Sequence, residues 1–289
     1  MGNLLHPETR VTGNMKLSDR EKARLKRRYG PWAVVTGASS GIGRSLAISC
    51  AAAGLNLVMC GRDEVRLREV EQQLKSAFGV LVRTVRSDLA KENSVPKIID
   101  ATNSVEVGLF IASAGYGTSG EFYRSAISDE IEMLRVNCEA LMKLTHHFAG
   151  RFVDQKRGGM VLLSSLVGFQ GVPFAANYAA TKAYVQSLAE GLSIELRPFG
   201  VDVLAAAPGP VRSGFEKRAD MRLGRSLTPE EIAPDILRSL GQRSLVVPGL
   251  LSKILINALR TLPRSLRIKT MGRIMRGFTE HQRSDDTRT

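Results

Sequence analysis

The sequence predicts an α/β fold in which helices cover both faces of a parallel β-sheet, the doubly wound arrangement. Two observations indicate this class. Short runs of Val, Leu and Ile recur along the chain and alternate with longer helical segments. Strands that are apolar throughout are typical of a parallel sheet buried on both faces. The 289 residues contain no internal repeat, low-complexity tract or Pro/Gly/Ser linker, so we expect a single domain.

The expected elements alternate from Trp32 onward. Strands are expected at residues 33–36, 55–60, 80–86, 107–112, 160–163, 201–206 and 245–247. Helices are expected at residues 42–53, 62–78, in the polar stretch after 89, and at 130–152 and 178–197. Residues 212–225 are charged and contain glycines, which indicates a loop with a short helix. Another helix begins near Thr228, because Pro229 suits a first turn and two acids follow at its positive end.

Both ends of the chain differ from this central part. The first 30 residues are polar and basic, and Ser18 can cap a short helix over residues 20–28. After Pro248, apolar residues recur at helical spacing as far as Leu262, Pro263 interrupts the pattern, and a basic helix follows. The sequence therefore predicts a basic N-terminal segment (1–30), an α/β domain (31–248) and an amphipathic basic helical tail (249–289).

The composition, 43% hydrophobic and 24% charged, is that of a globular soluble protein. Cys50, Cys60 and Cys138 lie in apolar segments, which excludes a disulfide framework and favours a reducing compartment. We find no signal-peptide pattern and no apolar run of about 20 residues, so we expect a cytoplasmic protein. His146 and His147 have no acid or cysteine at ligand spacing, so we expect no metal.

The net charge of +13 calls for an explanation. Nucleic acid is not expected as a partner, because the chain has no recognition module and only 6% aromatic residues for stacking. An anionic cofactor, an anionic substrate or an anionic membrane surface fits better, although net charge by itself does not decide between them.

A glycine-rich stretch between the first strand and the first helix predicts a nucleotide site. Glycine permits a tight turn and lets the backbone approach a phosphate closely, and a helix N-terminus supplies free N–H groups and partial positive charge. The alternative is a merely tight connection between strand and helix. We expect a dinucleotide pyrophosphate to bind along Thr36, Gly37, Ser39, Ser40, Gly41, Ile42 and Gly43.

The end of the second expected strand predicts which cofactor is bound. In dinucleotide-binding folds an acid about 20 residues after the glycines usually holds the ribose 2′-hydroxyl. Here the strand ends in Cys60-Gly61 and Arg62 follows, so the acid is missing. A guanidinium matches a 2′-phosphate in charge and geometry, so NADP(H) is favoured over NAD(H). The alternative is a solvated Arg62 at a helix start that Asp63 caps.

A tyrosine and a lysine, Tyr178 and Lys182, are spaced i and i+4 and so lie on one helix face. A free tyrosine has a pKa near about 10, and the ammonium together with an oxidised nicotinamide ring should lower that pKa. Tyr178 could then give a proton to a carbonyl oxygen as hydride arrives, and a serine hydroxyl, from Ser164 or Ser165, could hold the same oxygen.

Together these patterns resemble the short-chain dehydrogenase/reductase family, over roughly Trp32 to Pro248. The resemblance implies a Rossmann fold and an oxidoreductase acting on C=O and CH–OH groups. The family's serine lies 13 residues before its tyrosine, which selects Ser165 over Ser164. The implied catalytic residues are Asn137, Ser165, Tyr178 and Lys182. Lys182 would also bond the nicotinamide ribose, and Asn137 would position a water.

The same resemblance implies further contacts with the cofactor, and a homo-oligomer. The additional cofactor positions are Asp88, Ala114, Gly115, Pro208, Gly209, Val211 and Ser213, together with Tyr178 and Lys182. One departure is clear: Ala112 and Ser113 stand where the family has two asparagines, so the amide side chain that steadies the fourth strand is lost. The alternative function is a non-catalytic NADP-binding redox sensor or scaffold, against which the intact catalytic residues count.

The segment between Ser165 and Tyr178 is almost wholly apolar, and loops at the strand C-termini carry the ligand in this fold. We therefore expect a fatty-acyl, steroid or terpenoid substrate of a carbonyl reductase in lipid metabolism; sugars are disfavoured. The alternative is that these residues only pack the loop. The approach to the glycines and the two-helix tail also resemble the 3-oxoacyl-CoA reductase/17β-hydroxysteroid dehydrogenase branch. The expected substrate contacts are Tyr116, Leu166, Phe169, Phe174 and Phe215.

The tail has two interpretations. No acid occurs between Asp235 and Glu280, whereas nine basic residues do. The tail could dock on the domain or on a partner subunit with a solvated basic face. It could instead lie on anionic lipid, where each basic residue contributes about 1 kcal/mol. Because the reacting residues all precede Pro248, the lipid interpretation predicts an active protein without the tail.

Overall fold

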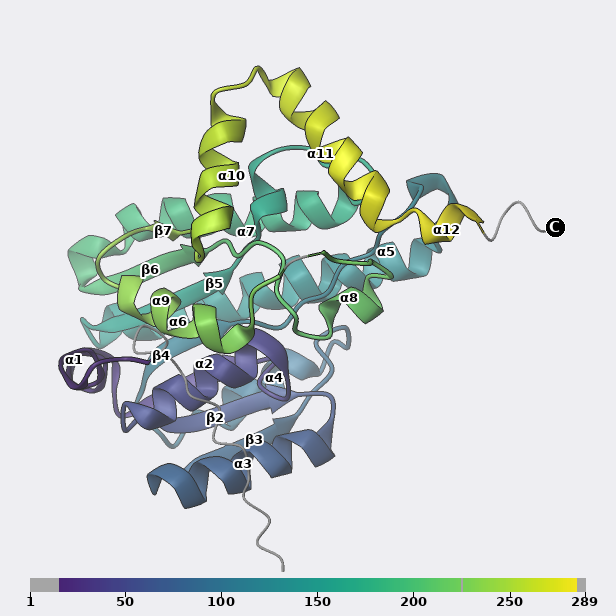
Figure 1. Ribbon diagram of the computed structural model, residues 1–289. Coiled ribbons are helices and arrows are strands. Elements are labelled where there is room, and N and C mark those ends of the chain that lie inside the picture. Colours follow the sequence, from purple (N-terminus) through teal and green to yellow (C-terminus); the bar gives the residue numbers. More distant parts are fainter. Residues whose placement is uncertain (1–15, 225, 285–289) are drawn as a thin grey trace, which may run out of the picture.

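Seven parallel strands form one sheet in the order β3-β2-β1-β4-β5-β6-β7 (Figure 1). The computed structural model describes residues 16–224 and 226–284. The strands are β1 (Trp32–Thr36), β2 (Asn56–Gly61), β3 (Val82–Arg86), β4 (Val107–Ala112), β5 (Gly158–Leu163), β6 (Val201–Ala206) and β7 (Leu245–Val246). The order reverses direction between β1 and β4, and ligands of such sheets bind at the carboxyl ends of the strands beside that point.

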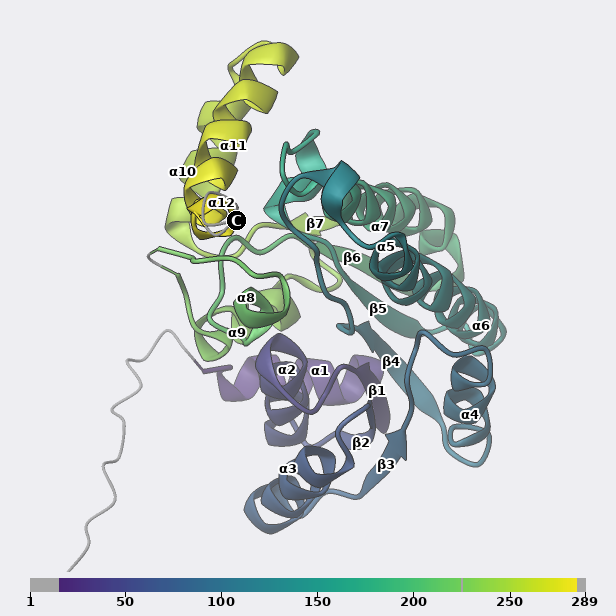
Figure 2. The ribbon, with the colours of Figure 1, turned by 90° about the vertical axis from the view of Figure 1, so that its right-hand side faces the viewer.

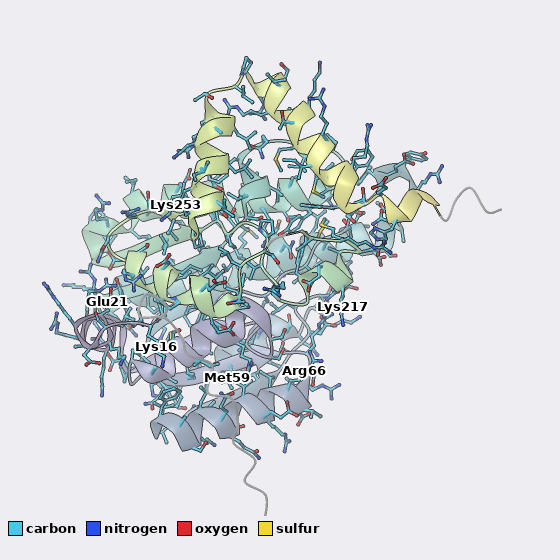
Figure 3. The ribbon with its side chains drawn as sticks, viewed as in Figure 1. Lys16, Glu21, Met59, Arg66, Lys217 and Lys253 are labelled. Carbon is cyan, nitrogen blue, oxygen red and sulfur yellow. The ribbon has the colours of Figure 1, made fainter. Side chains whose placement is uncertain are left out.

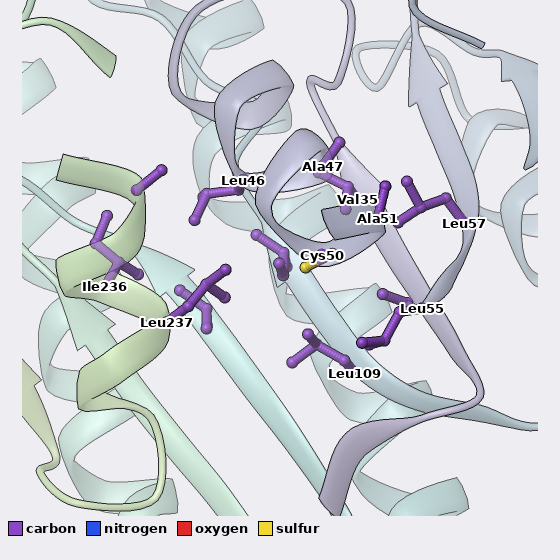
Figure 4. Packing of buried hydrophobic residues seen from close by; sticks show 14 of the residues in the cluster. Val35, Leu46, Ala47, Cys50, Ala51, Leu55, Leu57, Leu109, Ile236 and Leu237 are labelled. Carbon is purple, nitrogen blue, oxygen red and sulfur yellow. The ribbon is translucent and has the colours of Figure 1, made fainter. Parts of the chain in front are cut away.

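Helices cover both faces of the sheet, which confirms the expected fold class (Figure 2). One face is covered by α1 (Asp19–Tyr29), α2 (Gly41–Ala52), α3 (Glu64–Phe78) and α9 (Pro229–Ser239). The other is covered by α4 (Ser94–Asp100), α6 (Leu141–Asp154) and α7 (Ala176–Glu195). Figure 4 shows the first core, in which α2 and α9 pack through Leu46, Ile236 and Leu237. Cys50 is fully buried there, as expected of a filler residue.

The N-terminal helix packs on the sheet as part of the domain. Ser18 and Glu21 form a capping box, which explains where α1 begins. Leu25 and Tyr29 are fully buried, and the Tyr29 hydroxyl donates to Asp202 at 2.8 Å. Glu21, labelled in Figure 3, pairs with an arginine of α9. The short helix expected at residues 20–28 is therefore confirmed, and its buried side belongs to the main core.

The expected helix over 130–152 is three consecutive segments. They are α5 (Ile127–Leu134), the π-helical η2 (Arg135–Ala140) and α6. A π-helical turn breaks the regular i to i−4 hydrogen bonding, and such turns are frequent at functional sites. Asn137 lies within η2 and is completely buried.

The tail forms a helical hairpin that stands out from the body of the protein in both views (Figures 1 and 2). Its helices are α10 (Leu250–Arg260) and α11 (Arg264–Phe278), separated at Pro263 as the sequence predicted, and α12 (His281–Ser284) follows. The short helix α8 (Phe215–Arg218) lies in the charged loop after β6. A third apolar cluster joins Leu259, Met271 and Met275 of the hairpin to residues around Tyr178. The remaining short helices are η1 (Phe122–Arg124), η3 (Leu166–Phe169) and η4 (Arg197–Phe199).

Candidate active site

The glycine turn has the geometry of a phosphate-binding loop. Gly37 and Gly41 have φ angles of 69° and 55°, which L side chains rarely adopt. A Cβ on Gly37 would lie 2.9 Å from the backbone of Ala114, and one on Gly43 would clash with the Gly37 carbonyl. Ser40 begins α2 without a side-chain cap, so the helix N-terminus presents its N–H groups to the cavity.

The ends of β1 and β4 are joined by one hydroxyl. The Thr36 Oγ1 atom accepts hydrogen bonds from the backbone N–H groups of Ser113 (3.1 Å) and Ala114 (3.2 Å). Thr36 and Ala112 are partners in the sheet register, so the glycine turn and the loop after β4 lie side by side. Ser113, the departure from the family pattern, is therefore held through its main chain.

The adenosine end of the cavity contains the expected Arg62 and Asp88. It also contains Arg66, which the sequence analysis did not select (labelled in Figure 3). Asp63 accepts a hydrogen bond from the Arg66 N–H at 3.0 Å and so caps α3. Arg62 precedes this cap and Arg66 lies in the first turn of α3, and both line the cavity. The nearness of the two arginines in the sequence was the signal available.

Tyr178 and Lys182 are both buried near the end of β5, with exposed fractions of 8% and 6%. The Lys182 Nζ atom donates to the Leu163 carbonyl at 2.8 Å and lies 5.9 Å from the centroid of the Tyr178 ring. Ser164 and Ser165 have different roles. The Ser164 hydroxyl donates to the Lys182 carbonyl at 2.8 Å, whereas the Ser165 hydroxyl donates to the Pro208 carbonyl at 3.4 Å and lines the cavity together with Tyr178.

The expected pKa of Tyr178 was wrong in direction for the protein alone. Burial raises the pKa of the phenol to about 12, and the hydrogen bond with Ser165 opposes this. Burial lowers the pKa of Lys182 to about 8. Desolvation of the phenol, which the sequence does not reveal, is the larger effect in the protein without cofactor.

Asn137 does not line the cavity but holds its floor. Its Oδ1 atom accepts from the Tyr116 N–H at 3.1 Å, and its Nδ2 atom donates to the Tyr116 carbonyl at 2.8 Å and to Thr181 Oγ1 at 3.1 Å. The side chain thereby ties the loop after β4 to α7 at Thr181, the residue next to Lys182. Gly115 lies above it, where a Cβ would be 3.0 Å from the amide oxygen.

A single cavity of about 840 Å³ connects these groups. Except for Asn137, every residue expected to be catalytic or to bind the cofactor lines it. These are Thr36, Gly37, Ser39, Ser40, Gly41, Ile42, Gly43, Arg62, Asp88, Ala114, Gly115, Ser165, Tyr178, Lys182, Pro208, Gly209, Val211 and Ser213. Among the described residues there is no group of three His, Cys, Asp or Glu placed to hold a metal ion.

The substrate end agrees only in part with the expectation. Tyr116, Leu166 and Phe215 line the cavity, and the Phe215 and Tyr178 rings lie 5.2 Å apart. Phe169 and Phe174 are not among the lining residues. Instead, Arg260 lies over the Phe169 ring and Arg276 over the Phe174 ring. These two aromatic residues hold the hairpin in place, which apolar character alone could not distinguish from substrate contact.

The α10–α11 hairpin contributes further side chains to the wall of the cavity at this end. Its inward side chains have the i, i+3, i+4, i+7 spacing of one helix face, which was visible in the sequence but also fits a lipid-facing helix. They are Leu255, Met271, Ile274, Met275 and Phe278. Arg218 of α8 also lines this end, 3.4 Å from the centroid of the Tyr116 ring and paired with Glu132. The tail therefore docks on the domain and lines the cavity, and the activity of a protein that ends near Pro248 remains a prediction of the lipid interpretation.

The end of the tail is fastened to the loops around the cavity. The Arg222 N–H donates to the Phe278 carbonyl at 2.9 Å. The Gln282 amide donates to Ser119 Oγ at 2.9 Å, and His281 lies 3.0 Å from Asp220. These contacts connect the loop after β4, the loop after β6 and the hairpin.

Comparison with known proteins identifies the family. The family model described as short chain dehydrogenase matches residues 31–223. The chain is 27% identical to a 7beta-hydroxysteroid dehydrogenase of Clostridium sardiniense, covering 86% of this chain and 97% of that one. It is 36% identical to a very-long-chain 3-oxoacyl-CoA reductase-like protein of Arabidopsis thaliana, over 64% of this chain and 61% of that one.

Solved structures agree in fold. A structure concerned with 7beta-hydroxysteroid dehydrogenase stereoselectivity has a TM-score of 0.80 at 26% identity, covering 86% of this chain and 98% of that one. A short-chain dehydrogenase from Sphingobium yanoikuyae with NADPH gives 0.72 at 30% identity, covering 80% and 94%. One from Burkholderia phymatum with NAD gives 0.72 at 25% identity, covering 80% and 93%. The chain therefore belongs to the short-chain dehydrogenase family of nicotinamide-dependent oxidoreductases acting on CH–OH and C=O groups.

Proposed function

We propose that the protein is an NADP(H)-dependent oxidoreductase that transfers hydride between the nicotinamide and a ketone or secondary alcohol of a large apolar molecule. One observation carries the proposal. The cavity runs without interruption from the glycine turn, past Tyr178, to a wall of aliphatic and aromatic side chains from α8, α10 and α11. The hydroxysteroid dehydrogenase and 3-oxoacyl-CoA reductase-like relatives support a steroid or fatty-acyl substrate.

The nicotinamide supplies or accepts the hydride, and the buried side chains handle the proton. Tyr178, kept protonated by its burial, donates to the carbonyl oxygen during reduction. Ser165, which lines the cavity together with Tyr178, would hold the same oxygen. Lys182 orients the ribose and returns a proton to the phenolate, for which its lowered pKa suits it. Asn137 holds the loop after β4 against α7 through its bonds with Tyr116 and Thr181.

The substrate proposal is tested with a panel of acyl, steroid and terpenoid ketones, with NADPH oxidation followed in solution. We expect turnover of one or more bulky apolar ketones and little turnover of sugars or small polar ketones, because the wall offers few polar partners. Preferential turnover of polyols or sugars would contradict the proposal.

We further propose that Arg62 and Arg66 together bind the 2′-phosphate of NADP(H). Charged hydrogen bonds contribute about 1.5–3 kcal/mol, so Arg62→Ala should weaken NADPH binding by roughly 10–100-fold and leave NADH nearly unaffected. Fluorescence titration with both cofactors measures this. Arg68→Ala is the matched control, because Arg68 lies on α3, the helix that follows Arg62, pairs with Glu64 and is not among the cavity-lining residues. An equal loss of NADH binding would show that Arg62 does not bind the phosphate.

The remaining proposals concern the surroundings of the protein. Apolar side chains exposed along α5 and α6 favour a second copy of the chain as a partner, with Ile127 67%, Ile131 42%, Leu134 43% and Met142 44% exposed. Sedimentation equilibrium measures that association.

No described helix is long and apolar enough to cross a bilayer. We propose that the protein is cytoplasmic, which the free thiols of Cys50 and Cys60 support. We also propose peripheral contact with an anionic membrane, which the basic tail supports.

A further inference from the structure

The two sides of the α10–α11 hairpin carry different chemistry. The inward side lines the substrate cavity or is buried against it. The outward side exposes cations and aliphatic side chains to solvent. The exposed residues are Leu250, Leu251, Lys253, Ile254, Arg260, Arg264, Leu266, Lys269, Arg273 and Arg276, which we call the hairpin surface. Docking on the fold and binding to a partner are therefore compatible, because, apart from Arg260 and Arg276, different residues serve each.

The cations of the hairpin surface are not neutralised by the protein. No acid occurs in the sequence between Asp235 and Glu280, and none of these cations pairs with a carboxylate elsewhere in residues 16–224 or 226–284. Only Arg260 and Arg276 have aromatic partners. Like charges that lack counterions repel one another, and this repulsion raises the electrostatic free energy of the protein in solution. An anionic surface beside them lowers that free energy.

Aliphatic side chains accompany the charges. Leu250, Leu251 and Ile254 of α10 are 74%, 60% and 56% exposed, and Leu266 of α11 is 40% exposed. Lys253, labelled in Figure 3, lies among the first group. Basic residues mixed with exposed aliphatic ones are typical of helices that lie at the boundary between lipid headgroups and acyl chains.

The hairpin is also placed to reach a flat surface. In Figures 1 and 2 its tip, around residues 260–264, is the part of the described chain that projects furthest from the sheet. A bilayer could therefore contact the tip without meeting the rest of the domain.

We propose that the hairpin surface binds the face of an anionic lipid bilayer, with the basic side chains at the headgroups and the exposed leucines among the upper acyl chains. A second copy of the chain is a poor occupant, because two hairpins of the same charge would repel. A nucleic acid is also a poor occupant, because the hairpin surface contains no aromatic side chain for base stacking. The bilayer is therefore the occupant that both the charge and the aliphatic side chains favour.

Binding to a bilayer would also bring the protein close to an apolar substrate, and this part of the inference rests on the proposed function. The side chains opposite the hairpin surface, Leu255 and Ile274 among them, line the substrate cavity. An apolar ketone dissolved in the bilayer would thus lie one helix diameter from the wall that binds it. Binding to the bilayer itself does not depend on the reaction and can be measured without substrate.

The test compares two charge reversals of the full-length protein in vesicle sedimentation. Arg264→Glu/Lys269→Glu alters the hairpin surface, and Arg20→Glu/Arg27→Glu makes the same change in net charge on α1, on another side of the molecule (Figure 1). With phosphatidylcholine vesicles containing phosphatidylglycerol, we expect the first variant to bind at least about 10²-fold more weakly and the second to bind nearly as the unchanged protein does. Added salt should release the protein. Vesicles of phosphatidylcholine alone should bind little.

Three results would overturn the proposal. Equal losses in the two variants would mean that net charge alone attracts the protein. Equal binding to neutral vesicles would remove the role of the cations. A soluble polyanion partner is indicated if Leu266→Ser leaves vesicle binding unchanged and heparin binds as tightly as vesicles. NADPH oxidation with a soluble ketone, measured without vesicles, reports on the proposed function separately: its absence alongside normal vesicle binding would contradict only the reaction.

Discussion

Replacing Tyr178 with phenylalanine is expected to lower the rate of ketone reduction by about 10²–10⁴ while NADPH continues to bind. The substitution removes one oxygen atom and leaves the ring, which packs against Phe215 at a centroid distance of 5.2 Å. The lost atom is the one that would donate the proton as hydride reaches the carbonyl carbon. The glycine turn and Arg62 do not depend on it, so cofactor affinity should change little.

The measurement is a pair of assays, NADPH oxidation with a reactive ketone and NADPH titration by fluorescence. Tyr184→Phe is the matched control, because Tyr184 lies on the same helix, is 37% exposed and is not among the cavity-lining residues. It should keep its full rate. Undiminished turnover in Tyr178→Phe would remove the proposed mechanism, and a parallel loss of NADPH binding would indicate a structural role instead.

Deleting residues 249–289 is expected to abolish activity on bulky apolar ketones while NADPH binding persists. Each fully buried aliphatic or aromatic side chain contributes about 1.5–3 kcal/mol, so losing contacts equal to two such residues lowers kcat/KM by roughly 10²-fold or more. The cofactor positions, from Thr36 to Ser213, remain in place. The deletion also exposes the cluster around Tyr178, so some loss of solubility is expected.

A point variant separates loss of the wall from loss of folding. Ile274→Ala should raise KM for a large ketone several-fold, because Ile274 lines the cavity. Leu251→Ala, on the outward side of the same hairpin and 60% exposed at that position, should leave KM in solution unchanged. If neither the deletion nor Ile274→Ala affected large ketones, the hairpin would not be part of the substrate site.

The sequence was sufficient for the sheet and the cofactor half of the site because both depend on short-range patterns. Continuous apolar runs predicted the strands, and the spacing from Thr36 to Gly43 fixed a strand, a turn and a helix N-terminus together. Helical spacing places Tyr178 and Lys182 on one face, but their role came from the combination of motifs and from the family resemblance, which also supplied Asp88, Pro208 and Gly209. The local structure that such patterns specify does not depend on contacts with distant parts of the chain.

The substrate half could not be predicted equally well because it depends on which distant surfaces meet. Phe169 and Phe174 are apolar residues beside the reacting tyrosine, yet they hold arginines of the hairpin. The face of α11 that contains Ile274 has the same periodicity whether it covers a cavity or a membrane. The pKa of Tyr178 likewise depends on burial, which one sequence does not reveal.

The fastening of the tail to its neighbouring loops has a kinetic consequence. The bonds from Arg222 to Phe278 and from Gln282 to Ser119 are local, and each contributes about 0.5–1.5 kcal/mol. These bonds, together with the apolar contacts of Leu259, Met271 and Met275, keep the wall closed, and local opening of the hairpin does not require the sheet to unfold. For the bulky substrate proposed above, we expect the product to leave through such opening, so that this step, rather than hydride transfer, limits turnover of the largest substrates.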